Sequence, residues 1–131
     1  HELEWQKKNV SFEYMKKFSS HMKATLTSLQ SKIDILKQDG NQKSISDMYA
    51  NLEKADSRME LYETVSYFEH MAIGIEEDYF DEEILKKAQH NVVVSTYSLL
   101  WPYLLLRRNE TKVRVGAHFE RLAKRWSEDK S

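Results

Sequence analysis

The 131-residue sequence contains no cysteine, one proline and only three glycines. The absence of cysteine excludes disulfide bonds and metal sites built on thiolates. So little glycine and proline disfavours a β-sheet protein, because its many turns depend on these two residues. The 31% charged and 40% hydrophobic content fits a soluble, helical domain.

Long hydrophobic runs are also absent. The most apolar stretch, residues 92–106, is 15 residues long and contains Ser95, Thr96 and Ser98. A helix that crosses a membrane needs ~20 apolar residues. We therefore expect this stretch to be a buried helix, and no signal peptide is visible.

Apolar residues spaced three and four apart predict helices over 3–37, 46–73, 82–107 and 110–126. The fold class that follows is all-α, a single domain over 1–131. Short connections favour a four-helix antiparallel bundle with a long N-terminal helical hairpin.

The expected boundaries in the first half come from capping residues. Asp39-Gly40-Asn41 ends the first helix, and Ser44 or Ser46 caps the second, which stops near Gly74. Ser57-x-x-Glu60 resembles a capping box, so a break there is an alternative. The unbroken apolar stripe from Ile45 through Met59 and Tyr62 to Ile75 favours one helix instead.

In the second half, Asp81 is expected to cap the third helix and Asn109 the fourth. Pro102 lies inside the third helix, where its missing N–H predicts a kink. Phe80 and Leu85 are placed to form a hydrophobic staple at the start of that helix.

The first helix is longer than a domain of this size needs, about 50 Å at 1.5 Å per residue. Residues 1–45 therefore form a leading helix and turn, in which Leu3, Trp5, Val10 and Phe12 either contact a second chain or pack on their own domain. We expect a homo-oligomer, a dimer, formed through this helix.

One local pattern occurs twice, as Phe68-Glu69-x-Met71-Ala72 and Phe119-Glu120-x-Leu122-Ala123. Each copy should bring a Phe and a Glu to a shared interior. A buried carboxylate needs a partner, so we expect a structural ion network of Glu69 and Glu120 with Arg107 or Arg108. Paired carboxylates also suit acid–base chemistry, which leaves an enzyme using Glu69 and Glu120 as an alternative; no residue is assigned as catalytic.

Charge is divided unevenly along the chain. Residues 1–85 carry 10 basic and 17 acidic side chains, whereas residues 86–131 carry 10 and 4. The basic third offers a candidate site for nucleic acid or another polyanion. Its members are Arg108, Lys112, Arg114, Arg121, Lys124 and Arg125. A solvated helix face is the simpler interpretation, because no nucleic-acid motif accompanies these residues.

No metal or cofactor is expected. Residues 76–83 hold six carboxylates, but their spacing does not match a calcium loop. The simpler role is capping and charge at the start of the third helix. The five histidines form no HExxH pair, and neither Glu69 nor Glu120 belongs to a Glu-x-x-His motif.

The sequence resembles a family of uncharacterised bacterial helical domains of unknown function. The resemblance covers residues 57–126 and consists of Tyr67-Phe68-Glu69-x-x-Ala72-Ile73-Gly74-Ile75, Trp101-Pro102-Tyr103 with Arg107, and Phe119-Glu120-x-Leu122-Ala123-x-x-Trp126. After Ile75 the loop is more acidic than the family pattern.

The resemblance implies a fold and no activity. Because members often carry an N-terminal membrane helix, it also implies a cytoplasmic domain, tethered to the inner face of the membrane by a segment absent from this chain. The function we expect is a helical protein–protein interaction or assembly module.

Overall fold

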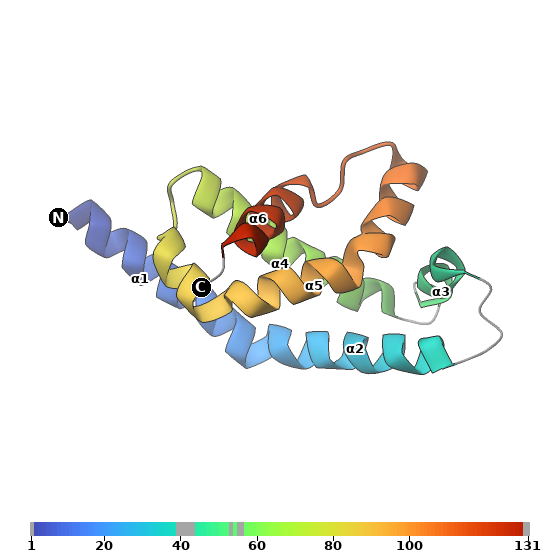
Figure 1. The fold of residues 1–131 in the computed structure, drawn as a ribbon. Helices are drawn as coiled ribbons and strands as arrows, with labels where there is room; N and C mark the ends of the chain where they lie inside the picture. The colour runs from blue at the N-terminus through green and yellow to red at the C-terminus, as the bar shows by residue number, and fades with distance from the viewer. Residues whose placement is uncertain (1, 39–43, 53, 55–56, 130–131) are drawn as a thin grey trace.

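The computed structural model describes residues 2–38, 44–52, 54 and 57–129. Within these ranges the chain is helical, with short connections and no strand (Figure 1). The predicted all-α class is confirmed. Packing as an antiparallel four-helix bundle remains a prediction, and the predicted turn at Asp39-Gly40-Asn41 lies outside the described residues.

The predicted first helix is present as α1 (Glu2–Lys17), η1 (Phe18–Met22) and α2 (Lys23–Gln38) without interruption. The segment η1 is a π-helical turn, in which the N–H of Lys23 bonds to the carbonyl of Phe18. Such a turn contains one more residue than an α-helical turn. Phe18 and Met22, four residues apart and on one side of the helix, both contact the same hydrophobic core.

The helix predicted over 46–73 is instead two helices, α3 (Ile45–Leu52) and α4 (Arg58–Glu76). The two point in different directions in Figure 1. Ser44 caps α3 as predicted, accepting the Asp47 N–H at 3.1 Å. The capping box at Ser57 does not form, because the Ser57 side chain makes no capping bond.

The apolar stripe across 45–75 is only partly buried. Met59 and Tyr62, both assigned to it, are 63% and 64% exposed. Val65, Phe68 and Ala72, which the stripe also contains, are buried as expected, and Leu61, which it lacks, is buried beside them. Helical spacing identifies residues on one face, but the other helices decide which face is buried.

Gly74 does not end α4, which continues to Glu76. It allows a close approach: a Cβ at Gly74 would lie 2.3 Å from Cδ2 of Phe80. Its carbonyl accepts the N–H groups of Tyr79 and Phe80. Asp81 then caps the next helix as predicted, accepting the Ile84 N–H at 3.1 Å.

The third helix, α5 (Glu82–Thr111), is longer than predicted and bends at Gln89, whose φ is −130°. The bend at Gln89 was not predicted. Figure 1 also shows the last part of α5 turning away from its middle part, in agreement with the bend expected at Pro102.

Asn109 lies inside α5 and does not cap the last helix, so that prediction is wrong. Lys112 ends α5 in the left-handed conformation, and Gly116, with φ +73°, precedes α6 (Ala117–Glu128). Residues 112–116 are therefore a connection where a helix was expected. Left-handed backbone suits glycine, which explains why the last helix begins after Gly116.

Two neighbouring clusters form the hydrophobic core. One lies where α4, α6 and the first part of α5 meet and includes Phe68, Phe119 and Trp126. The other joins α2, α3 and the middle of α5 and includes Leu29, Tyr49 and Leu100. No helix in the described part of the chain is long and apolar enough to cross a membrane.

Candidate functional site

The repeated Phe-Glu pattern joins α4 to α6. Phe68 and Phe119 are both fully buried, and their rings stack with centroids 5.1 Å apart and planes 17° apart. The prediction that both phenylalanines reach a shared interior is confirmed. The two glutamates next to them have different roles.

Glu69 caps α6 from the neighbouring helix. The first N–H groups of a helix lack partners within it, and the cap residue Gly116 has no side chain to supply one. Oε1 of Glu69 accepts the Phe119 N–H at 2.7 Å. A carboxylate at this end also interacts favourably with the helix dipole. Glu69 therefore fixes the start of α6 against α4.

Glu120 pairs with basic side chains on three sides. Its carboxylate lies 2.8 Å from Arg108 Nη1, 2.9 Å from Lys124 Nζ and 3.5 Å from Arg114 Nη2. Burial alone would raise the pKa of Glu120. Lys124 and Arg108 donate hydrogen bonds to its carboxylate, and these bonds and the two positive charges lower the pKa to about 2. Glu120 is thus a buried anion whose charge is compensated.

Arg108 is itself held in place. Its Nε donates to the Val115 carbonyl at 2.8 Å, and its guanidinium lies 5.3 Å from the centre of the Trp101 ring. The ion pair therefore connects α5, the connection before α6, and α6. The structure brings Glu120 and Arg108 together. Glu69 instead bonds to the backbone of α6, and Arg107 lies near Glu110, 3.7 Å away.

These geometries make Glu69 and Glu120 poor acid–base groups. A general acid needs a pKa near the working pH, whereas the pKa of Glu120 is held at about 2. Glu69 has one oxygen bonded to the backbone of Phe119. An enzyme built on this pair is therefore the least supported of the functions considered.

We expect Glu69→Ala to lower the free energy of unfolding by about 1 kcal/mol, the usual loss when a helix cap is removed. Glu69→Gln should lose less, because an acceptor oxygen remains. Chemical denaturation measures both, and amide exchange should show faster opening at Phe119. Glu77→Ala, which removes an exposed carboxylate directly after the end of α4, is the control. A Glu69→Ala protein that melts at or above the wild-type temperature would instead favour a catalytic role.

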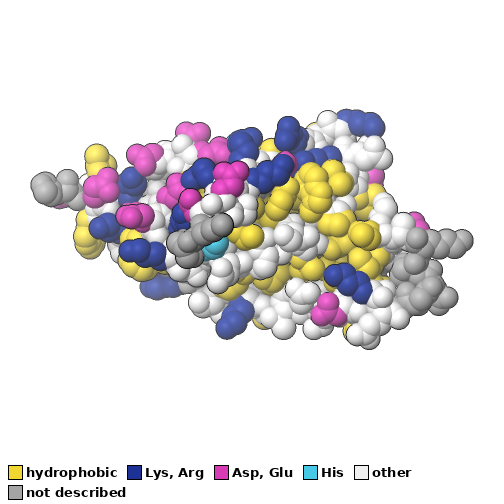
Figure 2. Space-filling view, in the orientation of Figure 1, with side chains coloured by type: hydrophobic (Ala, Val, Ile, Leu, Met, Phe, Trp, Pro, Cys, Tyr) yellow, Lys and Arg dark blue, Asp and Glu magenta, His cyan; other side chains and the backbone are white. Residues whose placement is uncertain are grey.

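The basic residues proposed to bind a polyanion are largely paired within the chain. Arg108, Arg114 and Lys124 contact Glu120, Arg121 contacts Glu76, and Arg125 contacts Glu82. Within the part of the chain that the structure describes, five of the six thus have a carboxylate partner and Lys112 has none. Figure 2 shows Lys and Arg interspersed with Asp and Glu on the face around α6. A phosphate backbone would compete with these carboxylates.

Three of the acidic residues in 76–83, Glu76, Asp78 and Glu82, also bind side chains elsewhere in the domain. Glu76 accepts from His118 and Arg121, and Asp78 from Lys7 at 2.7 Å. Glu82 accepts from the Trp126 indole at 2.8 Å. In the described ranges, no group of three or more His, Asp or Glu side chains could hold a metal ion.

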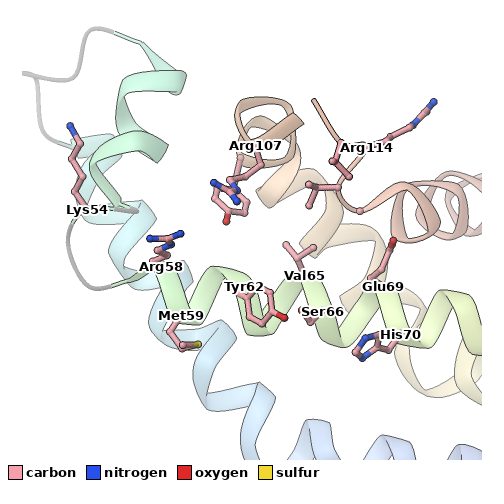
Figure 3. Close-up of a pocket in the computed structure, with 14 residues that line it drawn as sticks. Lys54, Arg58, Met59, Tyr62, Val65, Ser66, Glu69, His70, Arg107 and Arg114 are labelled. Atoms are coloured by element: carbon pink, nitrogen blue, oxygen red, sulfur yellow. The ribbon is translucent and has the colours of Figure 1, made fainter. Parts of the chain in front are cut away.

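A pocket of about 1020 Å³ opens between α4, the end of α5 and the connection before α6. Arg58, Lys54, Arg107 and Arg114 line it, together with apolar side chains such as Val65. Figure 3 shows Arg58 and Arg107 directed toward the same space, with Val65 beside it. Sequence reasoning missed this pocket because it assigned Met59 and Tyr62, which also line it, to the buried stripe.

A second exposed feature is the projecting end of α1. Leu3, Trp5 and Phe12 are 74%, 66% and 52% exposed. The N-terminal part of α1 extends beyond the other helices in Figure 1, and Figure 2 shows hydrophobic side chains on its surface. Val10, grouped with them in the sequence, packs against its own core, which is the second of the two alternatives expected.

The chain matches one family of known sequences. A family described as Domain of unknown function (DUF4760) matches residues 2–126. No curated protein and no solved structure matches the chain.

Proposed function

The chain belongs to this family of domains of unknown function, and we propose that it is an assembly module, which pairs with a second copy of itself through α1. The observation that carries the proposal is the exposure of Trp5 and Phe12 on a helix that extends past its own core. Exposed aromatic side chains of this size are typical anchors of protein interfaces.

Trp5 and Phe12 lie on one face of α1. They are seven residues apart, which is two turns of a helix. Tyr14, by contrast, faces inward, donating to the Tyr67 carbonyl. The domain's own packing therefore leaves one aromatic face of α1 uncovered, as in the seam between two paired helices.

The charges of α1 support an antiparallel arrangement. Glu2 and Glu4 lie in its first turn, and Lys16 and Lys17 in its last. With Trp5 of one copy opposite Phe12 of the other, Glu2 lies next to the second copy's Lys16, because each is about one helical turn beyond its aromatic residue. A parallel pair would place like charges together.

We expect the double variant Trp5→Lys, Phe12→Lys to weaken self-association at least tenfold, since each anchor of this kind contributes about 2 kcal/mol or more. Light scattering across a concentration series measures the change in mass. The matched control is Ile35→Lys with Ile45→Lys, which replaces two apolar side chains that are 66% and 59% exposed elsewhere on the surface.

A wild-type chain that stays monomeric at high concentration would contradict the proposal. Equal loss of association in the control pair would also contradict it, because the effect would then not belong to α1.

The other expectations remain proposals with less support. Nucleic-acid or polyanion binding by the α6 surface requires breaking the pairs with Glu76, Glu82 and Glu120 described above. A tether to the inner face of a membrane rests on the family resemblance alone. The contact between α2 and α4 supports the N-terminal helical hairpin expected for an antiparallel bundle.

A further inference from the structure

We propose that the pocket between α4 and the end of α5 binds a small amphipathic anion, a phosphate or carboxylate head group attached to an alkyl chain. The volume of about 1020 Å³ is large enough for such a ligand. This site is separate from the exposed face of α1, so it stands independently of self-association.

The head group would lie between Arg58 and Arg107. Arg58 begins α4 and Arg107 lies near the end of α5, and both are directed into the same space in Figure 3. Guanidinium groups bind phosphate and carboxylate through two parallel N–H bonds, which a single lysine cannot do. Both side chains also interact within the chain, and Arg107 lies 3.7 Å from Glu110.

The alkyl chain would lie along the apolar part of the pocket. Val65 from α4 and Val113 and Val115 from the connection before α6 supply this part. The only carboxylate lining the pocket among the described residues, Glu69, lies farther along α4 and bonds to Phe119. An anion is therefore favoured at the arginine end and disfavoured at the other, which sets the direction of the ligand.

The charge of the lining decides the class of ligand. Arg58 and Arg107 face the space between them, whereas Lys54 and Arg114 extend away from it in Figure 3, and Arg114 pairs with Glu120. A neutral or cationic amphiphile gains less from the two arginines than an anion does. The carboxylates that neutralise the α6 surface, Glu76, Glu82 and Glu120, do not line this pocket. Arg58 and Arg107 therefore define the anion end of the pocket.

Calorimetry with dodecyl phosphate, kept below its micelle concentration, tests the proposal. We expect one molecule to bind per chain. Dodecanol, which lacks the anion, and inorganic phosphate, which lacks the chain, should each bind at least about tenfold more weakly, because each loses one of the two contributions.

Two variants locate the site. Arg58→Gln with Arg107→Gln should weaken dodecyl phosphate binding at least about tenfold, since bonds to a charged head group are among the stronger ones. Arg121→Gln with Arg125→Gln removes the same charge from α6 and should leave binding unchanged. Val113→Asp, at an exposed position of the wall, should also weaken binding, and it does not depend on the packing of α4 or α5.

The source of the head group is tested with vesicles containing phosphatidic acid. Binding to free dodecyl phosphate, with or without vesicle binding, supports the pocket. Binding to vesicles alone overturns it, because a surface would then suffice. Equal affinity of the wild type and the Arg58/Arg107 variant, with both folded by circular dichroism, would also overturn it, as would affinity for dodecanol equal to that for dodecyl phosphate.

Discussion

Glu120→Ala is expected to lower the free energy of unfolding by about 3–5 kcal/mol, the usual cost of removing one partner of a buried ion pair. Glu120 is only 5% exposed, and its removal leaves the half-buried Arg108 without its nearest counter-charge. Arg108→Ala should cost a similar amount, and the double variant less than the sum, because both changes remove one interaction. Urea denaturation of the four proteins measures this coupling.

Glu128→Ala is the matched control for this prediction. It removes an exposed carboxylate from the same helix and should change the stability by less than about 0.5 kcal/mol. Additive losses in the Glu120 and Arg108 variants would contradict a direct pair.

The same ion pair predicts acid sensitivity. The pKa of Glu120 is about 2 in the folded protein and about 4.3 for an unperturbed glutamate. A lowered pKa stabilises the folded state fully above the unfolded value. This stabilisation is lost as the pH falls from about 4.3 toward 2. Glu120→Gln should therefore show a shallower fall in stability across this range than the wild type.

Phe119→Ala is expected to lower the free energy of unfolding by about 3–5 kcal/mol, and Phe68→Ala by a similar amount, because each leaves a large cavity in the core. Both side chains are fully buried, and the two rings stack on each other. The double variant should differ from the sum by about 0.5–1.5 kcal/mol, the usual coupling of an aromatic pair.

Val113→Ala, which truncates an exposed apolar side chain on the connection before α6, is the control and should have little effect. If Phe68→Ala and Phe119→Ala proved strictly additive, the two helices would not depend on each other through these rings. Losses below about 1 kcal/mol would contradict their central place in the core.

The repeated Phe-Glu pattern was the most informative part of the sequence. It correctly brought Phe68 and Phe119 together, because a large apolar side chain flanked by small and apolar neighbours on a helix has few alternatives to burial. It also identified Glu120 as a buried carboxylate. It could not assign the partners, because adjacent residues on α5, Arg107 and Arg108, point in different directions and only packing determines which one faces α6.

The missed features depend on contacts between distant residues. Asn109 is a good cap by type, yet α5 continues past it and residues 112–116 separate α5 from α6. The packing of Gly116 against Leu104 and its left-handed backbone favour a later start for α6. The pocket was not predicted either, because it too depends on residues that are distant in the sequence. Its arginines are 49 positions apart in the sequence, and only the fold brings Arg58 and Arg107 to one space.

The most direct test of assembly through α1 uses a single pyrene label, since the chain has no cysteine to compete with an introduced one. Asn9 lies near the midpoint between Trp5 and Phe12, so antiparallel pairing places two labels at Asn9→Cys close together. Labels at Glu2→Cys would lie about 20 Å apart along the helix axis. Antiparallel pairing predicts concentration-dependent excimer emission at position 9, abolished by Trp5→Lys with Phe12→Lys, and none at position 2. Monomer emission from both positions at every concentration would contradict it.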